Sequence, residues 1–214
     1  MTASGKTRPH FGRGELELPP ARCVFINCPF DPAYAAIFDA IVFTVVSCGF
    51  MPRSALESGN VAEQRMERIA RAIFSSRYSI HDLSRCTGSG DENFARFNMP
   101  PELGMAMARR WMHKGEEHDW LVLVPNGHSY QRFDSDLGGF DPEPHDGTTE
   151  SVVPAVVAWL AQRPDAVSNV TPSSILESLP AFVAEKNRLT VAWRRSPPWS
   201  DLVLSAMSIA RQVP

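Results

Sequence analysis

The segment most suggestive of chemistry runs Arg96-Phe-Asn-Met-Pro-Pro-Glu-Leu-Gly-Met-Ala106 and places a glutamate directly after two prolines. Pro101 disfavours helical geometry at Pro100, so the pattern predicts a helix that begins at Pro101, with Glu102 in its first turn. Unpaired N–H groups and the helix dipole favour an ionised carboxylate at that position. Such a carboxylate suits attack on an electrophilic sugar carbon, or stabilisation of an oxocarbenium-like transition state. The alternative interpretation is that Glu102 only complements the helix dipole.

A second polar segment, Ser79-Ile-His-Asp-Leu-Ser84, follows the start of a predicted strand. Asp82 at the carboxyl end of that strand could bind ribose hydroxyls or hold a catalytic water. The structural alternative is a loop cap that accepts a hydrogen bond from the next backbone N–H. His81 lies between alternating strand residues, which favours a hydrogen-bonded core histidine over a catalytic base.

The third segment, Asn27-Cys-Pro-Phe-Asp31, closes an apolar run and begins a helix. It has Pro29 and the ring of Phe30 where phosphate-binding loops have glycines, so it suits a base or ribose better than a triphosphate. The sequence contains neither GxGxxG nor GxxxxGK[ST], which disfavours a dinucleotide fingerprint and a P-loop.

Other common catalytic and metal-binding patterns are missing from the sequence. The histidines have no HxxxH or HExxH spacing, the cysteines form no CxxC pair, and there is no GxSxG elbow. We therefore expect no metal and no bound cofactor. The cysteine pattern predicts buried or idle thiols in a reducing cytoplasm.

The elements that must position these segments alternate along the chain. Short apolar runs predict strands, and stretches with helical spacing predict helices between them. The expected strands are 22–28, 50–56, 78–83 and 120–125, and the expected helices are 32–49, 61–75, 101–112, 150–162, 172–189 and 199–212. In the second helix the spacing predicts an inward stripe of Met66, Ile69, Ala70, Ile73 and Phe74.

This alternation predicts a three-layer α/β fold with a parallel sheet of four or five strands, of the flavodoxin-like or Rossmann-like kind, with extra C-terminal helices. Any fifth strand is expected to be short or missing. We expect residues 1–20 to be a flexible N-terminal tail and residues 21–165 to form an α/β nucleotide-pocket domain. Residues 166–214 are expected to be a helical extension packed on that domain.

The composition narrows the classes of partner. Hydrophobic residues make up 43% and charged residues 21% of the chain, and the net charge is −3. There is no dense Lys/Arg stripe, so nucleic acid is not an expected partner. The longest apolar stretch, Ala35 to Cys48, is interrupted by Asp39 and is too short for a membrane span. We expect a cytoplasmic protein without a membrane partner.

Taken in order, the three segments resemble the nucleoside 2-deoxyribosyltransferase group and its relatives, the TIR domains that cleave NAD. The resemblance covers residues 22 to 126. Glu102-Leu-Gly-Met-Ala106 is similar to the family segment that carries the nucleophilic glutamate, with Met105 where an aromatic is usual. A long loop ending Phe97-Asn98-Met99-Pro100 replaces the family's short Asp-x-Gly-Thr lead into the glutamate.

The resemblance implies a hydrolase or transferase that cleaves the N-glycosidic bond of NAD, a nucleoside or a nucleotide, with Glu102 and Asp82 as catalytic residues. The alternative is a non-catalytic TIR-like module that senses a nucleotide or binds a protein. The C-terminal helices could then contact a partner protein or a second copy of the chain. The residues expected to bind the substrate are Asn27, Pro29, Phe30, Asp31, Arg53, Ser84, Phe97 and Asn98.

Overall fold

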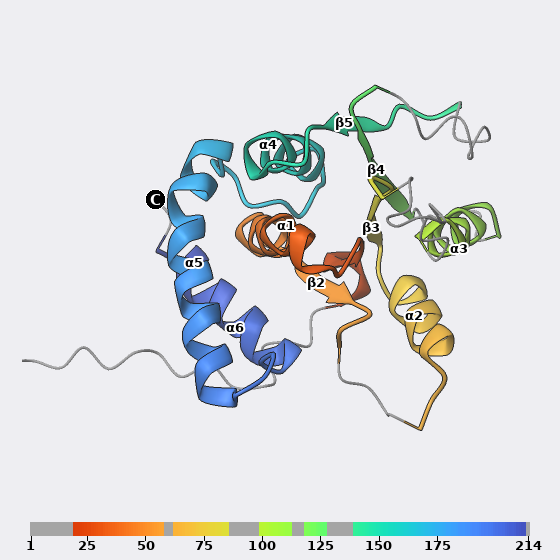
Figure 1. The fold of residues 1–214 in the computed structure, drawn as a ribbon. Helices are drawn as coiled ribbons and strands as arrows, with labels where there is room; N and C mark the ends of the chain where they lie inside the picture. The colour runs from red at the N-terminus through yellow and green to blue at the C-terminus, as the bar shows by residue number, and fades with distance from the viewer. Residues whose placement is uncertain (1–18, 58–61, 86–98, 113–117, 128–138, 213–214) are drawn as a thin grey trace, which may run out of the picture.

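The computed structural model describes residues 19–57, 62–85, 99–112, 118–127 and 139–212. Its centre is a five-stranded sheet in which every strand pair is parallel, in the order β2-β1-β3-β4-β5 (Figure 1). The three-layer α/β fold predicted from the sequence is confirmed. The strands are β1 Cys23–Asn27, β2 Met51–Ser54, β3 Tyr78–Asp82, β4 Asp119–Pro125 and β5 Glu143–His145.

The central strands are buried on both faces, as near-continuous apolar runs require. Successive side chains point to opposite faces, so β1 sends Val24 and Ile26 into one hydrophobic core and Phe25 into another. In β4, Leu121 and Leu123 join the first core, and the intervening Val122 packs on the opposite face. Both faces of the sheet therefore need a layer of helices.

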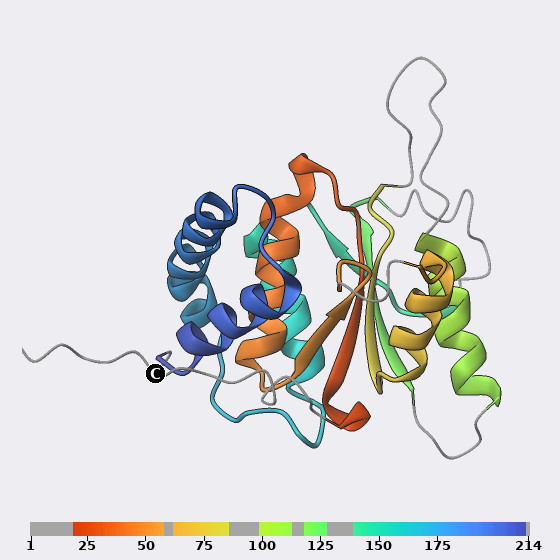
Figure 2. The same ribbon diagram turned by 90° about the horizontal axis from the view of Figure 1, so that it is seen from below.

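Helices cover the two faces unequally. Figure 2 shows α1 and α4 on one face, α2 and α3 on the other, and α5 and α6 outside α1 and α4. The helices are α1 Ala35–Ser47, α2 Arg65–Phe74, α3 Met99–Met112, α4 Thr149–Leu160, α5 Pro172–Trp193 and α6 Trp199–Ala210, with 3₁₀ turns η2 Pro20–Arg22 and η3 Pro32–Tyr34.

The C-terminal helices share the larger core instead of forming a separate one. The ring of Phe182 on α5 is fully buried and stacks on Phe43 of α1 at a centroid distance of 5.3 Å. Leu202 and Val203 of α6 are buried in the same cluster. Because α1 lies between the sheet and this outer layer, it is apolar nearly all round.

Two sequence predictions need correction. Helix α3 begins at Met99 and not at Pro101. A proline in the first turn of a helix costs no hydrogen bond, because the N–H groups there have no partner within the helix. On α2, Met66 and Phe74 are 43% and 44% exposed, since Ile69 and Ile73 are the residues that face the core.

Edge strand β5 is three residues long and was not located by the sequence pattern. It pairs with β4 from Leu123 to Pro125, which completes the sheet. Within the described residues, no helix combines the length and the apolar character needed to cross a bilayer.

Candidate functional site

The order of strands reverses between β1 and β3, and ligands of open α/β sheets bind beyond the carboxyl ends of strands at such a point. Asn27 ends β1 and Asp82 ends β3. The structure therefore puts two of the predicted site residues on the two strands that flank this position.

Asp82 is fully buried and surrounded by donors. The Tyr34 hydroxyl donates to its Oδ2, and the Ser84 N–H donates to its Oδ1 at 2.7 Å. His145 Nε2 lies 3.2 Å from Oδ2 as an electrostatic contact that falls outside hydrogen-bond geometry. The Gly147 N–H donates to His145 Nδ1 at 3.1 Å, so the ring proton is on Nε2 and faces the carboxylate.

Asn27 is buried on the opposite face of the sheet and ties β1 to the start of α3. Its Nδ2 group donates to the Met99 carbonyl at 2.9 Å and to His81 Nδ1 at 3.0 Å. His81 must then carry its proton on Nε2, which lies 2.8 Å from Ser79 Oγ. His81 is thus a hydrogen-bonded core residue, as its position in the strand indicated. Because the helix that carries Glu102 begins at Met99, Asn27 fixes where that helix starts.

The hydrogen-bonded chain continues from Ser79 into a second buried histidine. Ser79 Oγ lies 3.0 Å from His118 Nε2, and His118 Nδ1 lies 2.9 Å from the Ser76 carbonyl. A consistent proton order has His81 donating to Ser79, Ser79 to His118, and His118 to Ser76. Burial lowers the pKa of His81 to about 3 and that of His118 to about 4, so both rings are neutral, as this order requires.

Glu102 is 3% exposed and, among the described residues, has no hydrogen-bond or ion-pair partner. Burial raises the pKa of its carboxyl to about 7, and the positive charge of Arg65 lowers it only in part. The sequence suggested that the helix dipole would hold this group ionised. The dipole is outweighed by desolvation, because no group within the described ranges donates a hydrogen bond to this carboxylate in place of water.

Burial and the negative charges of nearby carboxylates raise the pKa of one thiol, that of Cys28. The pKa of Cys28 is raised well above its ordinary value, first by burial and then by the negative charges of Asp82, Glu102 and Asp31. Cys28 follows Asn27 directly, so the negative charges of these three carboxylates act on the end of β1. The thiol itself is held protonated and is a poor nucleophile.

Two cavities open at this edge of the sheet. The first, which we name the polar pocket, has a volume of about 600 Å³ and is lined by Ser84, Arg85 and His145 among others. The second, of about 630 Å³, is lined by Pro29, Phe30 and Asp31 together with residues of α5 and α6. We name this second cavity the aromatic cleft.

Turn η3 separates the two cavities: its Pro32 lines the aromatic cleft and its Ala33 lines the polar pocket. An ion pair crosses beside this ridge, where Arg85 Nη2 lies 2.9 Å from Asp31 Oδ1. The predicted contacts Pro29, Phe30 and Asp31 therefore lie in one cavity and Ser84 in the other.

The other predicted substrate-binding residues lie in neither cavity or outside the described residues. Arg53 forms a two-point ion pair with Glu57, with Nε–Oε1 and Nη2–Oε2 distances of 2.6 and 2.9 Å. It lines neither of the two cavities. Phe97 and Asn98 lie outside the described residues. Tyr34, Arg85 and His145 were not predicted, because no short-range motif links them to Asp82.

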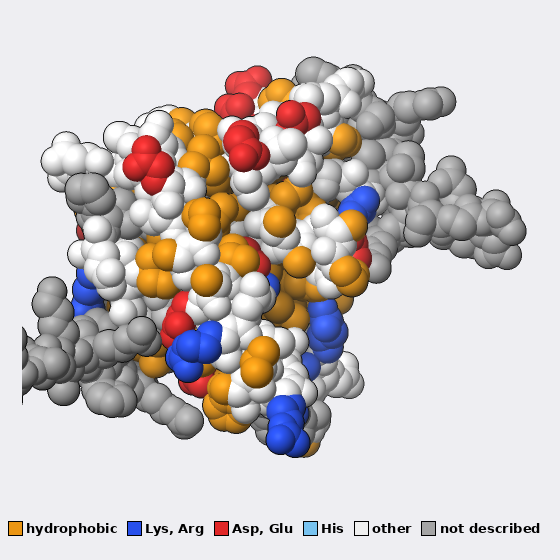
Figure 3. All heavy atoms as spheres, turned by 60° about the vertical axis from the view of Figure 1, so that its left-hand side comes forward, with side chains coloured by type: hydrophobic (Ala, Val, Ile, Leu, Met, Phe, Trp, Pro, Cys, Tyr) orange, Lys and Arg blue, Asp and Glu red, His pale blue; other side chains and the backbone are white. Residues whose placement is uncertain are grey.

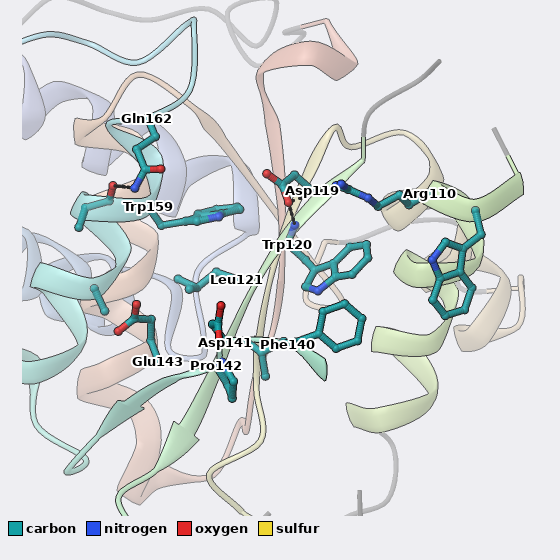
Figure 4. A pocket seen from close by; sticks show the side chains of 14 residues that line it. Arg110, Asp119, Trp120, Leu121, Phe140, Asp141, Pro142, Glu143, Trp159 and Gln162 are labelled. Atoms are coloured by element: carbon teal, nitrogen blue, oxygen red, sulfur yellow. Dashed lines mark hydrogen bonds and ion pairs between the residues drawn. The ribbon is translucent and has the colours of Figure 1, made fainter. Parts of the chain in front are cut away.

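A third pocket, of about 330 Å³, lies beside β4 and away from these residues (Figure 4). Its side chains contact each other: Trp120 packs edge-on against Phe140 at 5.6 Å, and the Arg110 guanidinium lies 5.4 Å from the centre of the Trp120 ring. Arg110 also pairs with Asp119 at 3.4 Å. We assign this pocket no role.

Comparison of the chain with models of known protein families, with curated proteins and with solved structures found no match. The resemblance to the nucleoside 2-deoxyribosyltransferase group and TIR domains therefore stays a prediction. In the described ranges, no three His, Cys, Asp or Glu side chains are grouped as metal ligands would be.

Proposed function

We propose that this chain is an enzyme that cleaves the N-glycosidic bond of NAD, a nucleoside or a nucleotide, with Glu102 as the catalytic carboxylate. The observation that carries the proposal is the state of Glu102. It is 3% exposed on α3, makes no hydrogen bond or ion pair within the described residues, and has a pKa raised by burial to about 7. Buried acids with strongly raised pKa values are concentrated at functional sites, because catalysis requires shifted pKa values and the stability cost of burial is retained for that purpose.

In this proposal the ionised Glu102 oxygen bonds to, or closely faces, the anomeric carbon while the bond from that carbon to the base breaks. The bonding electron pair leaves with the base. Positive charge develops on the sugar in the transition state but not in the ground state, so a desolvated carboxylate lowers the barrier more than it strengthens substrate binding. Water or a second base then takes the sugar and frees the carboxylate.

Asp82 acts through its neighbours. Since its oxygens already accept from Tyr34 and Ser84 and it is fully buried, its contribution is to orient Tyr34 and His145 at the end of β3. His145 and Ser84 line the polar pocket, and in this proposal their polar groups bind sugar hydroxyls. Glu102 itself does not line that pocket.

The decisive experiment is to incubate the protein with NAD and a panel of nucleosides and nucleotides, and to follow the release of free base by chromatography. Glu102→Gln should abolish base release, by several powers of ten or more than ~4 kcal/mol in barrier height, while much of the substrate affinity is kept. The matched control is Glu67→Gln on α2, which also removes a first-turn glutamate but an exposed one. It should keep full activity.

The pH dependence offers a second readout. Because Glu102 must be ionised to act, base release should rise with pH through an apparent pKa of about 7. Base release that survives Glu102→Gln would refute the assignment. Specific binding of a nucleotide without any turnover would instead establish the sensing module.

A further inference from the structure

The aromatic cleft has the size and lining of a small-molecule site. Its volume of about 630 Å³ lies within the ~300–1,000 Å³ typical of ligand pockets. One wall is a row of aromatic rings in contact, with Phe30 on Phe38 at 5.5 Å and Phe38 on Trp199 at 6.1 Å between ring centres. Trp193 and Leu56 also line the cleft, and each is 47% exposed.

The cleft is built by segments that are far apart in the chain. Phe30 comes from the loop after β1, Leu56 from the loop after β2, and Trp193 and Trp199 from the ends of α5 and α6. Figure 3 shows the face on which α5 and α6 lie, where hydrophobic side chains are interspersed with Lys and Arg side chains in the lower part of the view. The extra C-terminal helices thus create a cavity that the sheet and its own helices would not form.

Among the described residues that line the cleft, Arg195 is the cation without a charged partner. Lys186 Nζ lies 2.6 and 2.7 Å from the two oxygens of Asp39, and Asp31 is paired with Arg85. Arg195 also lines the cleft, is exposed, and makes no ion pair or hydrogen bond within the described ranges. A ligand with a negative charge would therefore find an ion-pair partner in Arg195.

From the aromatic wall and the single available guanidinium, we infer that the aromatic cleft binds a small planar aromatic monoanion, such as an aromatic carboxylate. The ring of the ligand packs among Phe30, Trp193 and Trp199, and its carboxylate pairs with Arg195. A planar guanidinium binds a carboxylate through two parallel hydrogen bonds, which gives this arrangement specificity. Neither Glu102 nor Asp82 lines the aromatic cleft, so this inference does not depend on the proposed glycosidase activity.

The test uses two probes of similar shape and different charge, 2-naphthoate and the neutral 2-naphthalenemethanol, titrated into the full-length protein by calorimetry. We expect 2-naphthoate to bind at least about fivefold more tightly than the neutral probe, as a charge-assisted pair in a partly enclosed site should give. The preference should shrink as salt is raised, while the affinity for the neutral probe should not fall.

Variants locate the site. Arg195→Gln should remove the preference for 2-naphthoate, whereas Arg188→Gln, which changes an exposed arginine on α5 paired with Glu185, should keep it. Trp193→Ala should weaken both probes and Trp193→Phe should restore most of the affinity. Because Trp193 is half exposed, these proteins should fold, which a thermal melt by circular dichroism verifies.

Equal affinity for the two probes, or an Arg195→Gln protein that still prefers 2-naphthoate, would overturn the inference. So would loss of probe binding with rising protein concentration, because a second copy of the chain would then cover the cleft. A fivefold preference that depends on Arg195 and on an aromatic ring at position 193 would establish it.

Discussion

The ionised form of Glu102 should destabilise the folded protein, and removing that charge should therefore raise stability at alkaline pH. The pKa of this carboxyl is about 7 in the folded protein against an ordinary value of 4.5. Each pKa unit corresponds to ~1.4 kcal/mol, so ionisation of Glu102 lowers the free energy of unfolding by ~3 kcal/mol in total. The folded state binds the proton more tightly than the unfolded state. The loss thus begins above pH 4.5 and is complete once the pH has passed 7.

Glu102→Gln abolishes this titration. We expect the free energy of unfolding of the variant, relative to the parent protein, to rise by ~2.5 kcal/mol between pH 5 and pH 8. The buried amide itself costs ~1 kcal/mol at every pH, which leaves the pH-dependent difference unaffected. Urea unfolding followed by tryptophan fluorescence at the two pH values measures it.

Glu67→Gln is again the control, because Glu67 is exposed in the first turn of α2 and its substitution should shift stability by less than ~0.5 kcal/mol at both pH values. If the difference in free energy of unfolding between Glu102→Gln and the parent protein is the same at pH 5 and pH 8, the pKa of the Glu102 carboxyl is not raised by burial. The reasoning that makes it a functional group would fail with it.

Two further predictions concern the interior. His81 and His118 should stay neutral down to about pH 5, with protons on His81 Nε2 and His118 Nδ1. The stability they contribute is complete above pH 6.5 and is lost as the pH falls through their lowered pKa values of about 3 and about 4. Nitrogen-15 NMR of the rings checks this, and a ring that titrates near pH 6.5 would contradict it. Phe182→Ala should cost ~3–5 kcal/mol in a single unfolding transition, whereas Val191→Ala, at a site 78% exposed, should change little. Separate melting of α5 and α6 would show that they are not part of the common core.

The sequence predicted the fold well where one local pattern decides the structure. The apolar run of β4 and the cap-and-proline start before α1 have few alternative conformations, so strand and helix could be assigned from the residues alone. Strand β5 could not, because Glu143–His145 has no apolar alternation. Its conformation is set by the hydrogen bonds it makes with β4, and these are visible only in three dimensions.

For the site, the sequence could indicate residues but not their surroundings. Asp82 was identified from its place at the end of a strand, yet its partner Tyr34 is 48 residues away in the chain. The position of Glu102 in the first turn of a helix could be predicted from the sequence. Its burial could not, because burial depends on how α3 packs on the sheet. Burial, not the dipole, then determines the pKa of the group. The sequence predicts local electrostatics and misses desolvation.

The buried chain of hydrogen bonds from Asn27 through His81 and Ser79 to His118 has a consequence for how the sheet assembles. Ser79 and His81 lie on the same face of β3 because side chains alternate along a strand. If β3 paired one residue out of register, Tyr78 and Ile80 would take that face. Asn27 would lose its hydrogen bond to His81, and His118 would lose its hydrogen bond to Ser79. A strand with only apolar side chains loses no hydrogen bonds when its register shifts. A shift of β3 would break the side-chain hydrogen bonds of both Ser79 and His81. The chain of hydrogen bonds therefore stabilises one register of the central strands over a register shifted by one residue.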